Sequence, residues 1–319
     1  MASAIHAQDL TKVYPHAPAG AMALSQFNLD VPTGGVYGLI GRNGAGKTTF
    51  VRIAATQLEP TSGTITVLGE DARSNERKIR AQIACVPQES RPLYFLRAEE
   101  VIYLYLKMRG LEPREARRRT EAVLEELSLR EVRRRLVSRL SGGLRRRILC
   151  AMVLASDADI LFLDEPTTGL DPIARREVWK AIRRASREHR TIVLTTHYLD
   201  EAEALSGRLA LIERGRLVLE GTPADLRDRV RFPYRVSVEG RFTHGELESY
   251  GRVSDIEGGF LVFTREAEAR ELARQALARG ARLSMGPVSL EDIFLEVVGR
   301  SIEEDGEKPD EEEDLVPNR

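Results

Sequence analysis

The sequence has 319 residues and a formal net charge of −1, which is enough for one large domain and a smaller one. Hydrophobic residues make up 42% and charged residues 30%, as in ordinary soluble globular proteins. No run approaches the roughly 18 apolar residues of a transmembrane helix, since Val101–Leu106 is followed at once by Lys107, and the first six residues do not resemble a signal peptide. We therefore expect a cytoplasmic protein that reaches a membrane only through a partner.

Charge is distributed unevenly along the chain. Residues 301–319 hold nine acidic residues against Lys308 and Arg319, a net charge of −7, so residues 1–300 carry +6. We expect this acidic, apolar-poor tail to be disordered. Arginine triplets at 117–119, 133–135 and 145–147 could mark a nucleic-acid surface, but aromatic residues are scarce at 6%. Solvated helix faces are the favoured interpretation, so no nucleic acid is expected as a partner.

Residues 1 to about 230 alternate between strand-like and helical runs. The sequence predicts strands at 36–40, 64–68, 82–86, 160–163 and 191–194, and helices at 48–56 and 173–188. Residues 98–139 are helical and charged, with a break at Gly110–Pro113. This alternation predicts a mainly parallel sheet covered on both faces, with the helices of 98–139 as an inserted subdomain. Cys85 and Cys150 are interpreted as small core residues and not as a disulfide.

The pattern changes after Pro223. Strand-like runs at 233–239, 259–264 and 281–285 alternate with helical runs at 266–278 and 290–298. We predict a small α/β accessory domain of about 70 residues. Its last helix has Ser289 as N-cap, and we give it a role in closing the accessory core or in stabilising a dimer.

The segment Gly41–Thr48 matches the pattern G-x-x-x-x-G-K-[ST] between a predicted strand and a predicted helix. Its glycines let backbone N–H groups curl around phosphate oxygens at the positive end of a helix. Lys47 would add a charge for the β- and γ-phosphates, and the Thr48 hydroxyl would ligate Mg²⁺. The residues of this phosphate-binding loop are Asn43, Gly44, Ala45, Gly46, Lys47, Thr48 and the following Thr49.

Two acidic residues, Asp164 and Glu165, close the predicted strand 160–163. Taken alone, such a pair is at least as often an ordinary pair of surface residues as a catalytic pair. Here it is preceded by Leu140-Ser141-Gly142-Gly143 and followed by Pro166-Thr167-Thr168-Gly169-Leu170-Asp171-Pro172. With the phosphate-binding loop, these runs resemble the ATP-binding-cassette (ABC) ATPase family over roughly residues 5–225.

The resemblance implies the fold and the division into domains. It implies an α/β P-loop NTPase with a mainly parallel sheet, an antiparallel N-terminal β subdomain and an inserted helical subdomain at about 90–150, plus a small C-terminal α/β domain. The expected boundaries are 1–230 for the ATPase domain, 231–300 for the accessory domain and 301–319 for the tail.

The resemblance also implies residue roles. Asp164 would hold Mg²⁺ and Glu165 would activate the attacking water, while Gln88 would contact both Mg²⁺ and that water. His197 resembles the switch histidine that contacts the γ-phosphate, although alone it would more often be a surface or capping histidine. Tyr14 resembles the aromatic residue that stacks on adenine, with Phe27 or Tyr37 as alternatives. Ser141 and Gly143 would contact the γ-phosphate bound by a partner copy, and Asp171, in the run that resembles the family's D-loop, is a further nucleotide-binding candidate.

Leu144 stands where the family usually has Gln, a departure that leaves Ser141 and Gly143 intact. One phosphate-binding loop and one Ser-Gly-Gly turn per chain imply a homodimer with two shared ATP sites. The family resemblance implies ATP and Mg²⁺ as cofactors. The order of cassette, small domain and the segment Ser289–Glu296 looks like that of ABC-2-type exporter subunits, which implies export of drugs, lipids or polysaccharides, a transmembrane permease as partner, and a place on the inner face of the cell membrane. The alternatives are a soluble ABC ATPase acting on nucleic acid, ribosomes or an assembly complex, and a regulator that barely hydrolyses ATP.

Overall fold

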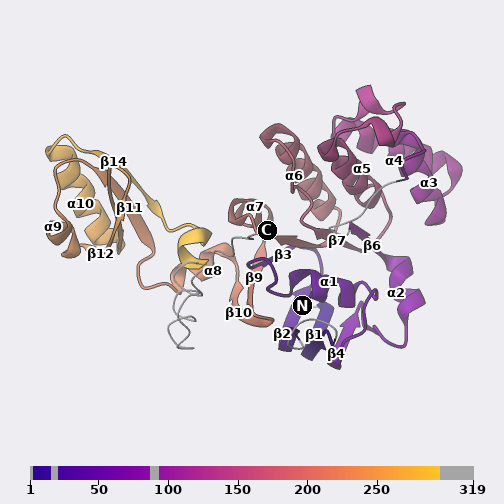
Figure 1. The fold of residues 1–319 in the computed structure, drawn as a ribbon, viewed down its shortest axis with the longest axis horizontal. Helices are drawn as coiled ribbons and strands as arrows, with labels where there is room; N and C mark the ends of the chain where they lie inside the picture. The colour runs from indigo at the N-terminus through magenta and orange to yellow at the C-terminus, as the bar shows by residue number, and fades with distance from the viewer. Residues whose placement is uncertain (1–2, 16–20, 87–92, 295–319) are drawn as a thin grey trace, which may run out of the picture. The chain divides into compact units, whose positions relative to one another are not determined.

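A computed structural model of the chain describes residues 3–15, 21–86 and 93–294. The chain forms two compact units that divide between Pro223 and Ala224, drawn in Figure 1 from indigo at the N-terminus to yellow. The predicted tail at 301–319, the end of the last predicted helix and Gln88 lie outside the described residues.

The first unit is built around a six-stranded sheet with the strand order β10-β9-β3-β8-β7-β6. All neighbouring pairs are parallel except β10 and β9. The predicted strands are present, with Gln82 belonging to a helix instead of the strand that follows it. The strands are β3 (Gly35–Ile40), β6 (Ile83–Val86), β7 (Ile160–Asp164), β8 (Thr191–Thr196), β9 (Arg208–Glu213) and β10 (Arg216–Gly221).

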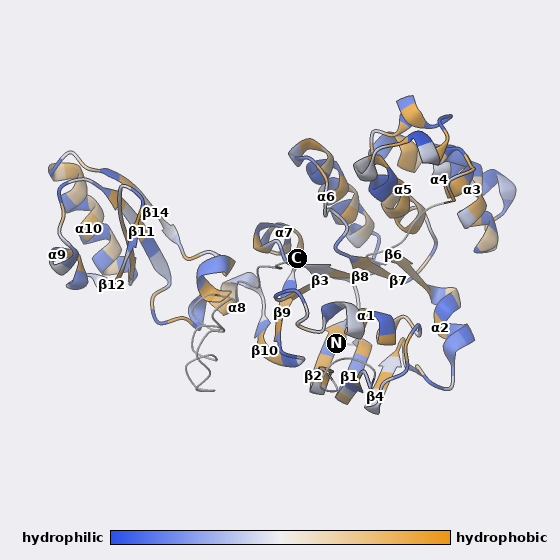
Figure 2. Cartoon of the chain, viewed as in Figure 1, coloured by the Kyte–Doolittle hydropathy of each residue, from blue (hydrophilic) through white to orange (hydrophobic). Residues whose placement is uncertain are grey.

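Both faces of this sheet are buried, because successive side chains on a strand point to opposite faces. On β7, Ile160 and Phe162 pack into one core, whereas Leu161 and Leu163 pack into the other. Figure 2 shows the central strands as mainly hydrophobic, in contrast to the mixed colouring of the helices. The unit therefore has two hydrophobic cores, one on each side of the sheet.

One core lies against an antiparallel sheet, which confirms the N-terminal β subdomain. Its strand order is β2-β1-β4-β5. Phe50 of α1 and Phe27 of β2 meet there with ring centroids 5.4 Å apart. The elements on this side are β1 (Ser3–Val13), β2 (Met22–Pro32), α1 (Lys47–Ala54), β4 (Ser62–Val67), β5 (Glu70–Asp71) and α2 (Glu76–Gln82).

Helices cover the other face of the central sheet. The predicted break between the first two lies where expected: Gly110 has φ +93° and Pro113 begins the second helix. The helices are α3 (Ala98–Met108), α4 (Pro113–Glu126), α5 (Gly142–Leu154), α6 (Pro172–Arg187) and α7 (Leu199–Leu205), with 3-10 turns at Arg130–Val132 and Val137–Arg139. α3, α4 and α5 pack against one another and form the helical subdomain.

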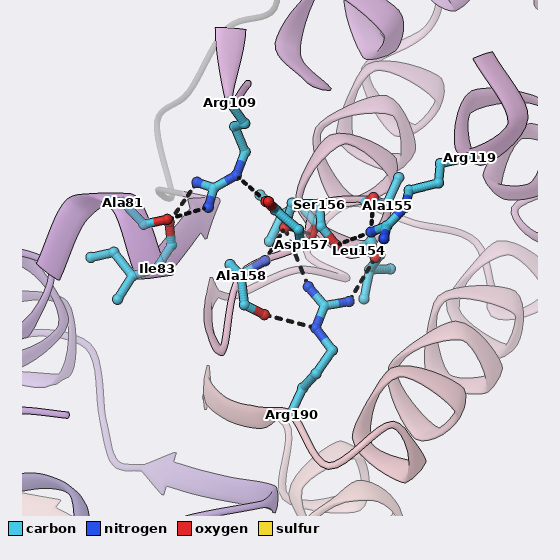
Figure 3. A network of polar contacts seen from close by, with 11 residues as sticks. Ala81, Ile83, Arg109, Arg119, Leu154, Ala155, Ser156, Asp157, Ala158 and Arg190 are labelled. Atoms are coloured by element: carbon cyan, nitrogen blue, oxygen red, sulfur yellow. Dashed lines mark hydrogen bonds and ion pairs between the residues drawn. The ribbon is translucent and has the colours of Figure 1, made fainter. Parts of the chain in front are cut away.

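Arginines fasten this helical subdomain to the central sheet (Figure 3). Arg109, which follows α3, donates to the backbone oxygens of Ala81 (2.9 Å) and Ile83 (2.7 Å) and pairs with Asp157 (3.0 Å). Arg119 of α4 donates to the backbone oxygens of residues 155 and 156 at 3.3 and 3.0 Å. The bonds of Arg109 satisfy backbone oxygens where α2 leads into β6, and those of Arg119 satisfy backbone oxygens at the turn from α5 into β7.

The second unit is a four-stranded antiparallel sheet of order β12-β13-β11-β14, with α10 packed against β11 and β14. β12 and α9 were not predicted from the sequence. The elements are α8 (Pro223–Asp228), which begins at the division, β11 (Tyr234–Glu239), α9 (His244–Glu248), β12 (Gly251–Ile256), β13 (Gly259–Thr264), α10 (Glu266–Ala278) and β14 (Arg282–Pro287). Ser289 caps the following helical turn, as predicted, and its Oγ accepts from the Asp292 N–H (3.2 Å).

In the first unit, Arg190 provides a test of the arginine contacts shown in Figure 3. Its guanidinium donates to the backbone oxygens of Ala158 (2.9 Å) and Leu154 (2.9 Å) and to Ser156 Oγ (3.2 Å). Replacing Arg190 with Met leaves these part-buried acceptors without their charged donor, so the free energy of unfolding should fall by about 2–3 kcal/mol. Unfolding in urea, followed by the fluorescence of Trp179, the single tryptophan, reports on the first unit. Arg118→Met is the control, because the side chain of Arg118 is 70% exposed and its loss should leave the free energy of unfolding nearly unchanged. An equal loss of unfolding free energy in the two variants would contradict the structural role assigned to Arg190.

Candidate active site

The phosphate-binding loop joins the end of β3 to the start of α1. Gly46 precedes α1 with φ +111°, and a Cβ on it would lie 2.5 Å from the backbone oxygen of Ala23, so only glycine fits. Asn43 and Gly44 are exposed and Ala45 is buried. The loop and the first N–H groups of α1 can therefore receive an anion, as predicted from the sequence.

Lys47 lies inside this loop and is only 5% exposed. Its Nζ donates to the backbone oxygens of Gly41 (2.7 Å) and Arg42 (3.0 Å). Burial lowers the pKa of Lys47, while the carboxylates of Glu165 and Asp164 act in the opposite direction. The structure thus brings Lys47 close to the two acidic residues that end β7.

Asp164 is held between two hydroxyl groups. Thr48 Oγ1 donates to its Oδ1 at 3.3 Å, and Thr195 of β8 donates to the same oxygen. Asp164 is 1% exposed, and burial raises its pKa although both hydroxyls favour the ionised form. Because β7 and β8 are in parallel register with Asp164 opposite Thr195, the sheet itself fixes this contact.

Glu165 follows Asp164 with φ +50°, a left-handed conformation that is uncommon for a non-glycine residue. Its Oε1 lies 3.1 Å from Nδ1 of His197, and its Oε2 accepts from Thr168 Oγ1 at 3.1 Å. The side chain of His197 is 33% exposed, whereas that of Glu165 is only 6% exposed. A carboxylate buried beside a half-buried imidazole is an arrangement suited to proton transfer.

Tyr14 lies at the rim of the loop, with its hydroxyl 3.4 Å from Thr49 Oγ1. It is half-buried. The alternatives, Phe27 and Tyr37, are 1% and 2% exposed within a hydrophobic core. Both rings are buried, so Tyr14 is the one of these three candidates that is partly accessible.

Ser141 and Gly143 lie on another element, the N-terminus of α5. Ser141 is exposed and caps the helix, its Oγ accepting from the Leu144 N–H at 3.3 Å. A Cβ on Gly143 would come within 3.3 Å of Leu170 Cδ2.

Asp171 is the residue that precedes α6. Its Oδ1 accepts from the N–H groups of residues 173 and 174 at 3.0 Å each. Its carboxylate therefore caps a helix, a use that the sequence did not suggest.

Three residues of the site were not predicted. Thr195 binds Asp164, Arg146 of α5 donates to the backbone oxygen of Glu165 at 2.8 Å, and Glu201 of α7 accepts from Thr167 and Trp179 at 2.8 Å each. Glu201 is fully buried, and burial raises its pKa. In the sequence, the one sign of this role was the spacing of Glu201, an acidic residue four positions after His197.

The chain is similar to known ATP-binding proteins. A family profile described as "ABC transporter" matches residues 24–168. The daunorubicin/doxorubicin resistance ATP-binding protein of Streptomyces peucetius is 34% identical over 98% of both chains. The Nod factor export ATP-binding protein I of Rhizobium etli is 35% identical over 94% of this chain and 95% of that one. The chain belongs to the ATP-binding proteins of the ABC transporter family.

Solved structures agree with this family assignment. The ATP-binding subunit of an ABC transporter superposes with a TM-score of 0.64 at 26% identity, over 71% of this chain and 93% of that one. A dimeric ATP-binding cassette bound to ADP and Pi gives 0.63 at 24% identity and supports the fold alone. The protein is thus an ABC ATPase subunit that binds ATP. Among its described residues, none of the helices has both the length and the apolar character needed to cross a membrane.

The pKa shifts of Asp164 and Asp171 predict opposite pH effects on stability. Because the folded state raises the pKa of Asp164, folding favours its protonated form, and its ionisation destabilises the fold as pH rises above about 4. Asp164→Asn keeps the Oδ1 acceptor and removes the titration. Without nucleotide, the melting temperature of the variant relative to wild type should therefore increase between pH 4 and pH 7.

Asp171→Asn is the matched control. Backbone hydrogen bonds, chiefly from Ala174, lower the pKa of Asp171, so its stabilising effect is present at neutral pH and is lost as pH falls. The relative melting temperature of this variant should decrease between pH 4 and pH 7. Melting temperatures that change in the same direction with pH in the two variants would contradict the opposite pKa shifts of Asp164 and Asp171.

Proposed function

We propose that this subunit hydrolyses Mg·ATP at two composite sites in a homodimer and powers a separate transmembrane permease of an exporter. The observation that carries the hydrolytic part is the contact between Glu165 Oε1 and His197 Nδ1 at 3.1 Å, beside the buried Asp164. Glu165 is an acid and not an amide, so it can accept a proton from the attacking water.

The proposed chemistry divides among neighbouring side chains. Lys47 neutralises charge on the β- and γ-phosphates, the N–H groups of residues 43–49 bind phosphate oxygens, and Tyr14 stacks on adenine. Thr168 and His197 orient the Glu165 carboxylate, and His197 also contacts the γ-phosphate.

The oxygens of Thr48 and Asp164 fit Mg²⁺, which prefers carboxylate, hydroxyl and phosphate oxygens. Asp164 is assigned as an ionised ligand because the metal offsets the burial that raises its pKa. When bound, Mg²⁺ supplies charge neutralisation on the phosphates. Gln88 is proposed to join this set, as the family resemblance implies.

The composite sites follow from the separation of two motifs in the chain. Ser141 and Gly143 lie at the N-terminus of α5, where the positive end of the helix dipole suits the γ-phosphate bound by a partner copy. In this arrangement each ATP joins one chain's phosphate-binding loop to the other chain's Ser-Gly-Gly turn, with Asp171 near the junction. ATP closes the dimer, and hydrolysis reopens it.

The names of the relatives, drug resistance and Nod factor export, support an exporter. The permease would be a separate protein, and the subunit would lie in the cytoplasm against the inner face of the membrane. Leu93 and Phe95, which follow Gln88, are 51% and 73% exposed. Such exposed apolar side chains are suited to contact a helix of the permease. The second unit is proposed as an accessory domain.

Glu165→Gln tests the hydrolytic assignment. The variant should lose at least about 100-fold in steady-state ATPase rate while still binding ATP, because the amide cannot accept the proton. Phosphate release and binding of a fluorescent ATP analogue are measured on the full chain. The matched control is Glu248→Gln, which alters a Glu–His pair of similar geometry (3.2 Å) in the second unit and should retain full activity. Full turnover by Glu165→Gln would refute the proposed function.

A further inference from the structure

We propose that Arg146 is a positioning residue that connects the Ser-Gly-Gly turn of each chain to that chain's own catalytic Glu165, and thereby couples the two ATP sites of the dimer. The inference rests on the proposed function and extends it to communication between the sites. It concerns a contact within one chain, between α5 and the end of β7.

The contact joins residues that are distant in sequence. The Arg146 guanidinium, whose residue is 9% exposed, donates from Nη2 to the backbone oxygen of Glu165 at 2.8 Å and to that of Asp164. A buried, permanently charged group needs such acceptors, because its desolvation is costly. Arg146 is therefore fixed in place by the two peptide groups that carry the catalytic carboxylates.

Those peptide groups determine where the Glu165 carboxylate points. The N–H of Glu165 donates to the backbone oxygen of Thr195 (3.0 Å) and to its Oγ1 (3.1 Å), while its backbone oxygen accepts from Arg146. The residue is thus held from β8 on one side and from α5 on the other, in the left-handed conformation with φ +50°. Such a conformation persists where surrounding contacts enforce it.

α5 also carries the part of the chain that serves the partner's ATP. Ser141 caps this helix and Arg146 lies five residues further along, roughly 7.5 Å along the axis at 1.5 Å per residue. A helix end that engages a γ-phosphate transmits its displacement as a rigid element. Engagement of the partner's ATP by Ser141 therefore sets the position of Arg146, and through it that of Glu165 at the chain's own ATP.

The neighbouring arginines do not share this arrangement. Arg145 donates to backbone oxygens of residues 137 and 138 at 3.2 and 3.1 Å. Arg147 donates to the backbone oxygen of Leu127 (3.0 Å) and to Glu177 (3.0 Å). Both fasten parts of the helical region, so Arg147→Met is a matched control on the same helix.

The test uses mixed dimers of two differently tagged full-length chains, assayed for single-turnover ATP hydrolysis. Arg146→Met is combined with Glu165→Gln either on the same chain or on opposite chains. If Arg146 acts on its own chain's Glu165, the same-chain dimer keeps one intact catalytic carboxylate. It should hydrolyse near the rate of a dimer carrying Glu165→Gln alone in one chain. The opposite-chain dimer has both carboxylates impaired and should be at least about tenfold slower.

Arg146→Lys keeps the charge and one donor direction, so it should restore part of the rate in the opposite-chain dimer. Arg147→Met in place of Arg146→Met should give equal rates in the two arrangements. Equal rates with Arg146→Met, or a faster opposite-chain dimer, would overturn the proposal. Failure of the proposed function is distinguishable, since the dimer would then not form, or Glu165→Gln in both chains would leave the turnover unchanged.

Discussion

The burial of two adjacent carboxylates at the end of β7 is the constraint on which the site depends. Asp164 and Glu165 are 1% and 5% exposed. Such groups are costly to bury unless neighbours supply hydrogen bonds or charge. Here that supply comes from Thr48 and Lys47 on α1, Thr195 on β8 and His197 after β8, while Arg146 on α5 binds the backbone oxygens of both residues.

In the proposed function, this dependence lets the site act as a motor. Each element that contacts the acidic pair also belongs to another part of the molecule: α1 begins at the phosphate-binding loop, β8 leads to His197, and α5 begins at the Ser-Gly-Gly turn. A displacement of any of them changes the hydrogen bonds of the catalytic pair. In the proposed mechanism ATP binding and hydrolysis produce such displacements, which the permease then uses.

The sequence predicted those features whose chemistry is local. The phosphate-binding loop, the Ser-Gly-Gly turn and the acidic pair are contiguous runs, so their positions followed from the sequence itself. Thr195 and Arg146 could not be found in this way. The contact of Thr195 with Asp164 depends on the register between β7 and β8. The contact of Arg146 with Glu165 depends on the packing of α5 against the end of β7. In the sequence, Arg146 was one of three successive arginines with no sign of which was buried.

Tertiary packing also bears on alternatives that the sequence left open. Of the three aromatic candidates for stacking on adenine, Phe27 and Tyr37 are buried in a core and Tyr14 is half-buried, which favours the proposal of Tyr14. β1 and β2 escaped prediction because their pairing has several register irregularities, which interrupt the alternation of polar and apolar residues. Gln88, in contrast, stays a prediction from the family resemblance.

The central claim is that ATP joins two chains at composite sites. Its most direct test is the oligomeric state of the Glu165→Gln variant, measured by light scattering on a sizing column with and without Mg·ATP. We expect a monomer without nucleotide, a dimer with it, and loss of that dimer when Ser141→Arg is added at the exposed end of α5. A monomer under both conditions, or a dimer that Ser141→Arg leaves unchanged, would contradict it.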